Sequence, residues 1–341
     1  MAERLARHTT LRLGGAAGDW VEATGEDALL DAVRAADDAG TPLLLLAGGS
    51  NLVVSDDGFP GTVVKVATRG VRVDQDACSG ATVTVAAGED WDAFVARAVA
   101  EGWVGVEALS GIPGSVGATP IQNVGAYGQE VAETIASVRC WDRQASVVRT
   151  LAAADCGFGY RTSRFKQDPG RYVVLSVTLQ LRLGDLGAPV RYAELARSLG
   201  VEPGGRAPMT RVREAVLDLR RGKGMVLDEA DHDTWSAGSF FTNPQLAPEQ
   251  AVTLPEDAPR WEQPDGRVKT SAAWLIERSG FARGHGNDRV SLSTKHTLAL
   301  TNRGGATTAD LLALAREVRD GVEQRFGVVL ENEPVTVGCA L

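Results

Sequence analysis

The most informative segment of this sequence is GIPGSVGATPIQNVGAYGQEV, residues 111–131. Five glycines fall within its first eighteen residues, among hydroxyl and carboxamide side chains, and the segment has neither helical nor strand periodicity. Loops of this length are uncommon in compact domains unless they are functional. Flexible linkers are seldom punctuated by apolar residues such as Ile112, Val116 and Val124. The segment therefore favours an almost uncharged surface, rich in backbone amides, for a large flat cofactor that carries a pyrophosphate.

A second glycine-containing segment, AGGSN at residues 47–51, follows the apolar run at 43–46. Consecutive small residues let backbone N–H groups converge on a phosphate, and Ser50 and Asn51 can add side-chain donors. Neither a GxGxxG nor a GxxxxGK[ST] pattern is present, so the segment is not a Rossmann turn or a P-loop. Taken alone, the segment is better explained as a tight hairpin turn. The longer glycine-rich segment makes a shared phosphate site the preferred interpretation.

The composition excludes several classes of protein. Glycine accounts for 39 of 341 residues, and the net charge is −9. An acidic chain without a basic run argues against nucleic acid and against an anionic membrane as partners. No apolar run approaches the ~20 residues of a spanning helix, so no membrane insertion is expected. The four cysteines are scattered and no secretory signal is apparent, which predicts reduced thiols in the cytoplasm and no metal site.

Apolar spacing predicts an α+β pattern in which strands cluster rather than alternate regularly with helices. Glycine and proline accumulate over residues 183–208, which predicts a boundary there, with a helix opening the second unit. The expected helices span residues 26–39, 90–101, 212–221, 271–278 and 309–326. The expected strands span residues 43–46, 52–54, 62–66, 81–87, 137–141, 146–151, 171–183, 297–301, 328–330 and 335–337.

Three shorter motifs offer reactive side chains. In GYRTSRFK (159–166), Arg161 can form a bidentate contact with a carboxylate, although by itself the motif is better explained as a solvated surface turn. In GSFFTNP (238–244), Ser239 lies between a glycine and two large apolar residues, a setting that would suit a proton donor. The alternative is that the segment is a strand edge in the core. No GxSxG pattern or nearby histidine supports Ser239 as a nucleophile.

The third motif, LENE at 330–333, places two acids on one face of a predicted strand. Either Glu331 or Glu333 is then a candidate acid or charge partner, and a solvated edge strand is the alternative. Lys223 is a further cation that can bind phosphate or assist the Ser239 hydroxyl.

These five motifs, in this order, closely resemble those of the UDP-N-acetylenolpyruvoylglucosamine reductase family, flavoenzymes that make UDP-N-acetylmuramate for peptidoglycan. The likeness runs from about residue 9 to 337. Residues 191–195 (RYAEL) look like the tyrosine-bearing lid of the type I branch. After Lys223 the chain reads GMVLDEADHD, where many relatives have Leu-Pro-Asp-Pro.

The resemblance implies a fold of two FAD-binding subdomains of the vanillyl-alcohol-oxidase/PCMH type, followed by an α+β substrate domain. The implied limits are 1–70 and 71–206 for the two subdomains, the second with the tyrosine lid, 207–327 for the substrate domain, and 328–341 for C-terminal strands with the catalytic glutamate. A cytoplasmic monomer is expected.

The resemblance also implies a mechanism in which NADPH reduces FAD and is replaced by the substrate, UDP-N-acetylglucosamine enolpyruvate. Arg161 matches the arginine that binds the substrate carboxylate, Glu333 its partner carboxylate, and Ser239 the serine that protonates the substrate. Tyr160, Tyr192, Lys223 and Asn243 match substrate contacts. The implied FAD contacts are Gly48, Gly49, Ser50, Asn51, Ile112, Pro113, Gly114, Ser115, Gly117, Ala118, Gln122, Asn123, Gly125 and Tyr127.

Two alternatives stay open. One is a related FAD-linked oxidase, although neither glycine-rich segment contains a histidine that could tether the flavin. The other is a catalytically silent protein that binds flavin or nucleotide in a regulatory role.

Overall fold

The computed structural model describes residues 2–341 as two compact units. Unit 1 comprises Met1–Ala17, Gly49–Phe59 and Lys223–Leu341, and unit 2 comprises Gly18–Gly48 and Pro60–Gly222. One boundary therefore falls inside the AGGSN segment, between Gly48 and Gly49.

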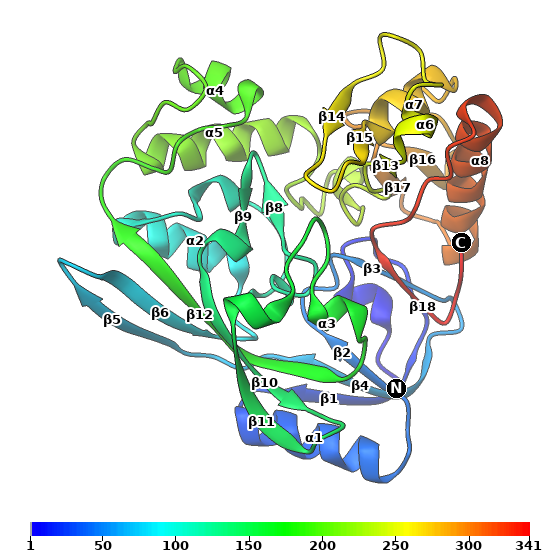
Figure 1. The fold of residues 1–341 in the computed structure, drawn as a ribbon. Coiled ribbons are helices and arrows are strands. Elements are labelled where there is room, and N and C mark those ends of the chain that lie inside the picture. Colours follow the sequence, from blue (N-terminus) through cyan, green and yellow to red (C-terminus); the bar gives the residue numbers. More distant parts are fainter. Residues whose placement is uncertain (1) are drawn as a thin grey trace. The chain divides into compact units, whose positions relative to one another are not determined.

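Unit 2 is built on a largely antiparallel sheet with the strand order β11-β10-β12-β6-β5, in which the short β7 also pairs with β12 (Figure 1). Alternation of buried and exposed residues along β12 matches the pattern expected from the sequence. The strands of this sheet are β5 (Val71–Asp76), β6 (Gly80–Ala86), β7 (Trp103–Val104), β10 (Ile135–Asp142), β11 (Val147–Ala152) and β12 (Tyr172–Leu183).

A smaller sheet with the order β1-β4-β2 belongs almost entirely to unit 2. Helix α1 (Glu26–Asp38) begins with two acids, which the helix dipole favours, and Gly40 follows its end with φ +62°. Its buried residues, Leu29 and Val33 among them, pack in one cluster with Val64 of β4. The strands are β1 (Ala17–Ala23), β2 (Leu43–Leu46) and β4 (Phe59–Val66).

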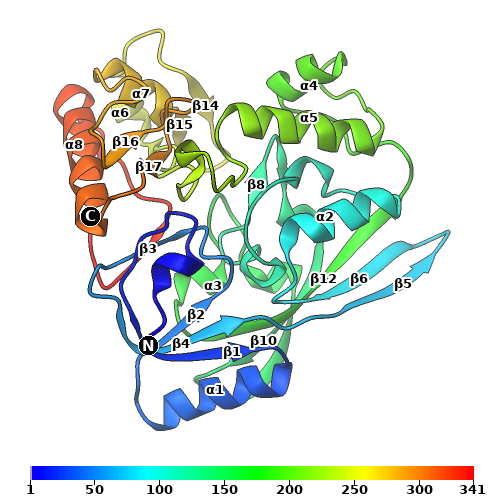
Figure 2. The ribbon, with the colours of Figure 1, turned by 180° about the vertical axis from the view of Figure 1, so that it is seen from behind.

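Helix α2 (Trp91–Ala100) contacts α5 (Met209–Gly222), and α5 also contacts α4 (Ala193–Leu199) (Figure 2). Because Val212 and Val216 of α5 are buried against Leu195 of α4, α5 is part of unit 2. The expectation that this helix opens the second unit is wrong, and the stretch 183–208 is not the boundary. Three short elements complete unit 2: β8 (Gly125–Ala126), β9 (Gln129–Glu130) and α3 (Arg164–Gln167).

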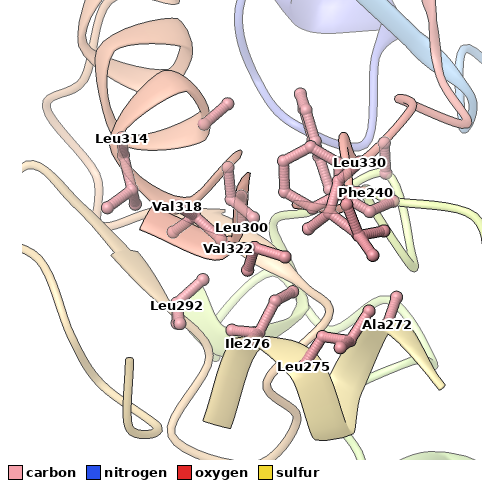
Figure 3. Packing of buried hydrophobic residues seen from close by; sticks show 14 of the residues in the cluster. Phe240, Ala272, Leu275, Ile276, Leu292, Leu300, Leu314, Val318, Val322 and Leu330 are labelled. Carbon is pink, nitrogen blue, oxygen red and sulfur yellow. The ribbon is translucent and has the colours of Figure 1, made fainter. Parts of the chain in front are cut away.

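Unit 1 is organised around the long helix α8 (Thr308–Phe326), which Thr307 and Asp310 cap reciprocally. Its buried face packs with α7 (Ala272–Arg278) and with Phe240 and Leu330 in one core (Figure 3). The remaining elements are β3 (Leu52–Val54), β13 (Gln245–Leu246), α6 (Pro248–Ala251), β14 (Arg260–Glu262), β15 (Val268–Thr270), β16 (Val290–Leu292), β17 (Leu300–Asn302) and β18 (Val335–Val337).

The C-terminal strand pair expected from the sequence does not form. Residues 328–330 are not a strand, and β18 instead pairs in parallel with β3, nearly three hundred residues earlier in the chain. This pairing explains why residues 49–59 belong to unit 1. The two units are each made of segments that are not consecutive in the chain, unlike the four consecutive segments expected above. That division into four segments stays a prediction.

Within residues 2–341, no helix is long and apolar enough to cross a membrane. The same residues contain no group of three or more His, Cys, Asp or Glu side chains that could hold a metal ion. All four cysteines are free thiols.

Candidate active site

The two glycine-rich segments meet within unit 2. A Cβ atom added to Gly48 would lie only 2.7 Å from the Cα atom of Gly114, so only glycine backbone permits this approach. Gly114 in turn accepts a hydrogen bond from the backbone N–H of Trp91, at the start of α2 (3.0 Å). A Cβ atom on Gly117 would lie 2.5 Å from the Cβ atom of Ala87. The long loop thus packs against the end of β6 at Gly117 and against the AGGSN segment at Gly114.

Asn123 organises the middle of the long loop. Its backbone is left-handed (φ +47°), its side chain is buried, and its Nδ2 donates to Glu130 Oε2 (2.7 Å) and to the carbonyl of Gly159 (3.1 Å). Its Oδ1 accepts from the backbone N–H of Ala132 (3.1 Å). Asn123 was expected as a cofactor contact, but its carboxamide forms hydrogen bonds that stabilise the loop.

Arg161 lies against the same loop rather than in a solvated surface turn. Its Nη2 donates to the carbonyl of Gly125 (2.8 Å) and its Nη1 to that of Asn123 (3.5 Å). The residue is half-buried, has a left-handed backbone (φ +52°), and lies over the ring of Tyr160 (5.5 Å to the ring centre). Left-handed non-glycine residues cluster at functional sites, and Arg161 and Asn123 are two of the five in the described chain.

Tyr127 and Tyr192 form an edge-to-face ring pair with centres 5.5 Å apart. Burial raises the pKa of Tyr127 to about 12, so its hydroxyl keeps its proton at neutral pH. Tyr192 is 45% exposed.

In unit 1 the segment that carries Ser239 pairs with the segment that carries Glu333. The backbone N–H of Glu333 donates to the carbonyl of Phe240 (2.8 Å), and that of Thr242 donates to the carbonyl of Glu331 (3.0 Å). Phe240 and Phe241 are almost fully buried, and Ser239 is half-buried beside them. Ser239 therefore follows Gly238 and precedes two buried aromatic residues, and its role as a proton donor stays a prediction.

The two candidate glutamates are not equivalent. Glu331 is exposed and Glu333 is half-buried, and the residue between them, Asn332, pairs with Phe241 in a single antiparallel bridge. Asn51 lies next to Glu333, since its Nδ2 donates to the Glu333 carbonyl (3.4 Å) and its own carbonyl accepts from the N–H of Val335 (2.9 Å). Its lower exposure and its contact with Asn51 make Glu333 the better of the two candidates for a site residue.

Gly49, Lys223 and Asn243 also belong to unit 1. Gly49 has φ +60°, and a Cβ atom there would lie 1.9 Å from the carbonyl oxygen of His8. The Oδ1 atom of Asn243 accepts from the N–H of Ala272 (3.0 Å), in the first turn of α7, so this expected substrate contact also has a structural role.

Arg220 was not among the residues expected at the site. This side chain is 8% exposed, burial lowers its pKa, and a Cβ atom on Gly111 would lie 3.3 Å from its Nε. Its spacing from Val212 and Val216 places it on the buried face of α5, and that helical pattern could have identified it.

The expected residues thus form two sets. Unit 2 holds Gly48, the loop 111–131, Tyr160, Arg161 and Tyr192, whereas unit 1 holds Gly49, Ser50, Asn51, Lys223, Ser239, Asn243 and Glu333. The close backbone contact between Gly48 and Gly114 fits a dinucleotide cofactor, because phosphates are commonly held by backbone amides of closely packed glycine-rich turns.

Comparison with known proteins identifies that cofactor. Residues 20–151 match the family model described as FAD binding domain, and residues 229–337 match the model described as UDP-N-acetylenolpyruvoylglucosamine reductase, C-terminal domain. FAD is therefore the cofactor, and the expected fold class is confirmed.

Full-length relatives agree. The chain is 58% identical to the UDP-N-acetylenolpyruvoylglucosamine reductases of Cutibacterium acnes and Streptomyces coelicolor, over 99% of this chain and 90% of each relative. It also resembles the crystal structure of the reductase from Thermus caldophilus, with a TM-score of 0.66 and 25% identity over 99% of both chains. The chain therefore belongs to the UDP-N-acetylenolpyruvoylglucosamine reductase family of FAD-dependent oxidoreductases.

Proposed function

We propose that this protein reduces the enolpyruvyl group of UDP-N-acetylglucosamine enolpyruvate to give UDP-N-acetylmuramate, with NADPH as the electron source. The observation that carries the proposal is the backbone pairing of the Ser239 and Glu333 segments within unit 1. The product is a peptidoglycan precursor, so the activity would serve cell-wall synthesis, cell shape and cell division. The protein would act as a monomer in the cytoplasm.

FAD, when bound, supplies the chemistry of taking a hydride from NADPH and passing a hydride to the terminal vinyl carbon of the substrate. NADPH becomes NADP⁺, and one hydride and one proton add across the carbon–carbon double bond. The residues of this chain must therefore bind both reactants, stabilise developing negative charge and deliver one proton.

The proton would come from the Oγ–H group of Ser239. Ser239 is half-buried and directly precedes the buried Phe240 and Phe241 in the chain, which supports a partly dehydrated hydroxyl. A serine hydroxyl is a weak acid, and Lys223, in the same unit, is the proposed source of assistance through a water chain.

Arg161 would bind the substrate carboxylate, on which negative charge builds as the hydride adds. Fixed cations near developing charge are an effective form of catalysis because they need no reorganisation during the reaction. The carbonyls of Gly125 and Asn123 hold the guanidinium in place beforehand. Glu333 would act as its partner carboxylate and bind the substrate acid.

The FAD phosphates and ring would be held by backbone amides and small side chains of the segments 48–51 and 112–127. Asn123 serves this surface as a positioning residue rather than by direct contact. Tyr160, Tyr192, Lys223 and Asn243 would contact the nucleotide-sugar end of the substrate.

The test is a turnover assay with the purified holoenzyme, NADPH and UDP-N-acetylglucosamine enolpyruvate. We expect NADPH to be oxidised only when the substrate is present, with formation of UDP-N-acetylmuramate. Hydrogen peroxide formed without the substrate would indicate an FAD-linked oxidase instead, and absence of any turnover would indicate a binding role.

A further inference from the structure

Residues 224–233 follow Lys223 directly and connect it to the Ser239 segment. At their end lies Asp233, a carboxylate that is only 5% exposed. Its Oδ1 accepts from the backbone N–H of Thr294 (3.0 Å) and from Arg303 Nη1 (2.9 Å), and its Oδ2 accepts from the Thr294 hydroxyl. A buried carboxylate with three donors from one neighbouring segment is a strong anchor.

That neighbouring segment, residues 293–303, also contacts the Ser239 segment directly. The N–H of Asn302 donates to the carbonyl of Trp235 (3.0 Å), and the N–H of Phe240 donates to the carbonyl of Leu298 (2.7 Å). Ser239 thus lies between two backbone hydrogen bonds to residues 293–303, and Asp233 fastens both ends of the same segment through Thr294 and Arg303. The Ser239 backbone therefore depends on the position of residues 293–303, which Asp233 holds at Thr294 and at Arg303.

We propose that Asp233 is a positioning residue that sets the place of the Ser239 hydroxyl through residues 293–303. The inference rests on the proposed role of Ser239 as proton donor. Asp233 itself delivers no proton, because its carboxylate is occupied by Thr294 and Arg303. Burial by itself raises the pKa of Asp233, but the hydrogen bonds from Thr294 and the charge of Arg303 outweigh burial and hold its pKa below the ordinary value.

Asp233→Asn removes the charge at nearly constant volume and turns one acceptor into an NH₂ group that faces a donor. A displacement of about 1 Å at a reacting group can slow a reaction on the order of 10²-fold, so we expect reoxidation of the reduced holoenzyme by substrate to slow by about 10-fold or more. Reduction by NADPH should stay within about twofold of the unchanged protein. The solvent deuterium isotope effect on reoxidation should rise, because delivery of the proton becomes slower.

Asp257→Asn is the control. Asp257 is another aspartate of unit 1 that pairs with an arginine, Arg278, but both side chains of this pair are 56% exposed. We expect this variant to keep both half-reactions and the isotope effect. Thr294→Val removes only the hydroxyl donor and should give the same pattern as Asp233→Asn to a smaller extent, which provides a second measurement if Asp233→Asn does not fold.

The outcomes separate the inference from the function on which it rests. If Ser239→Ala reoxidises at the rate of the unchanged protein, the proton-donor role fails. If Ser239→Ala is blocked while Asp233→Asn and Thr294→Val reoxidise normally, only the inference about Asp233 fails. Equal slowing of both half-reactions, with an unchanged isotope effect, would likewise overturn it, because that pattern indicates general loss of structure.

Discussion

In unit 2, the loop that carries Asn123 and Gly125 is held by side chains that bond to backbone, whereas in unit 1 the segments of Ser239 and Glu333 are held by backbone pairing. Asn123 makes three hydrogen bonds through its carboxamide, and Arg161 makes two through its guanidinium. The Ser239 and Glu333 segments instead exchange backbone bonds with each other and with residues 298 and 302.

The difference predicts how each region responds to substitution. Backbone pairing does not depend on the identity of Ser239 or Glu333, so their side chains can be changed with little damage to unit 1. In the loop of unit 2, the side chains of Asn123 and Arg161 both line the proposed site and stabilise the loop through hydrogen bonds. Substitutions there should therefore affect both stability and FAD binding.

The largest effect is expected for Ser239→Ala, which tests the unit 1 side of the comparison. Loss of a general acid typically costs about 10²–10⁴-fold in rate, so reoxidation by substrate should slow by that amount while reduction by NADPH is unchanged. Rapid-mixing measurements of the two half-reactions check this prediction. Loss of both half-reactions together would contradict the proton-donor role.

Gly48→Ala should weaken FAD binding next most strongly. The added Cβ would lie 2.7 Å from the Cα atom of Gly114, and relief of such a clash costs about 1–3 kcal/mol, or about 5- to 150-fold in FAD affinity. Gly25→Ala is the control, because nothing lies within 4 Å of the position of its Cβ. Titration of FAD into the cofactor-free protein should show a change for Gly48→Ala only, and equal affinities would refute the shared phosphate site.

Asn123→Ala should destabilise the holoenzyme by about 2–3 kcal/mol, since it leaves the Glu130 carboxylate and the N–H of Ala132 without a partner. Asn123→Gly tolerates the left-handed backbone and should be about 1 kcal/mol less damaging. Denaturant unfolding at a fixed FAD concentration separates the two contributions. Identical free energies of unfolding for the two variants would show that the left-handed backbone at residue 123 does not add to the loss of stability.

The smallest effect concerns acid stability. Burial raises the pKa of Asp92, but hydrogen bonds from Arg213 and from the N–H of Gly111 outweigh it and hold the pKa below its ordinary value. Its contribution is therefore complete above about pH 4, near the unfolded pKa, and is lost as the pH falls through the lower folded value.

Asp92→Asn should accordingly lower the free energy of unfolding at pH 6 and flatten its decline between pH 5 and pH 3. Asp265→Asn is an exposed comparison in unit 1, where Arg267 is the partner. A decline as steep in Asp92→Asn as in the unchanged protein would show that Asp92 does not contribute.

Much of the secondary structure was predictable because it depends on local periodicity. The helices at 26–38, 91–100 and 308–326 and the strand at 172–183 differ from expectation by no more than one residue at either end. By contrast, residues 297–301 were expected as a strand and only Leu300–Asn302 form one. The candidate motifs were recognised through their order along the chain, which tertiary packing does not alter.

The sequence alone determined the chemical character of the site: glycine-rich segments for a phosphate, an arginine for a carboxylate, and a serine among phenylalanines. Only the tertiary structure decided that β18 pairs with β3, that Glu333 is more buried than Glu331, and that Asp233 fastens the Ser239 segment. The physical reason is the separation along the chain over which each effect acts. Periodicity and residue chemistry act over a few positions, whereas burial and hydrogen-bond partners depend on segments separated by tens to hundreds of residues.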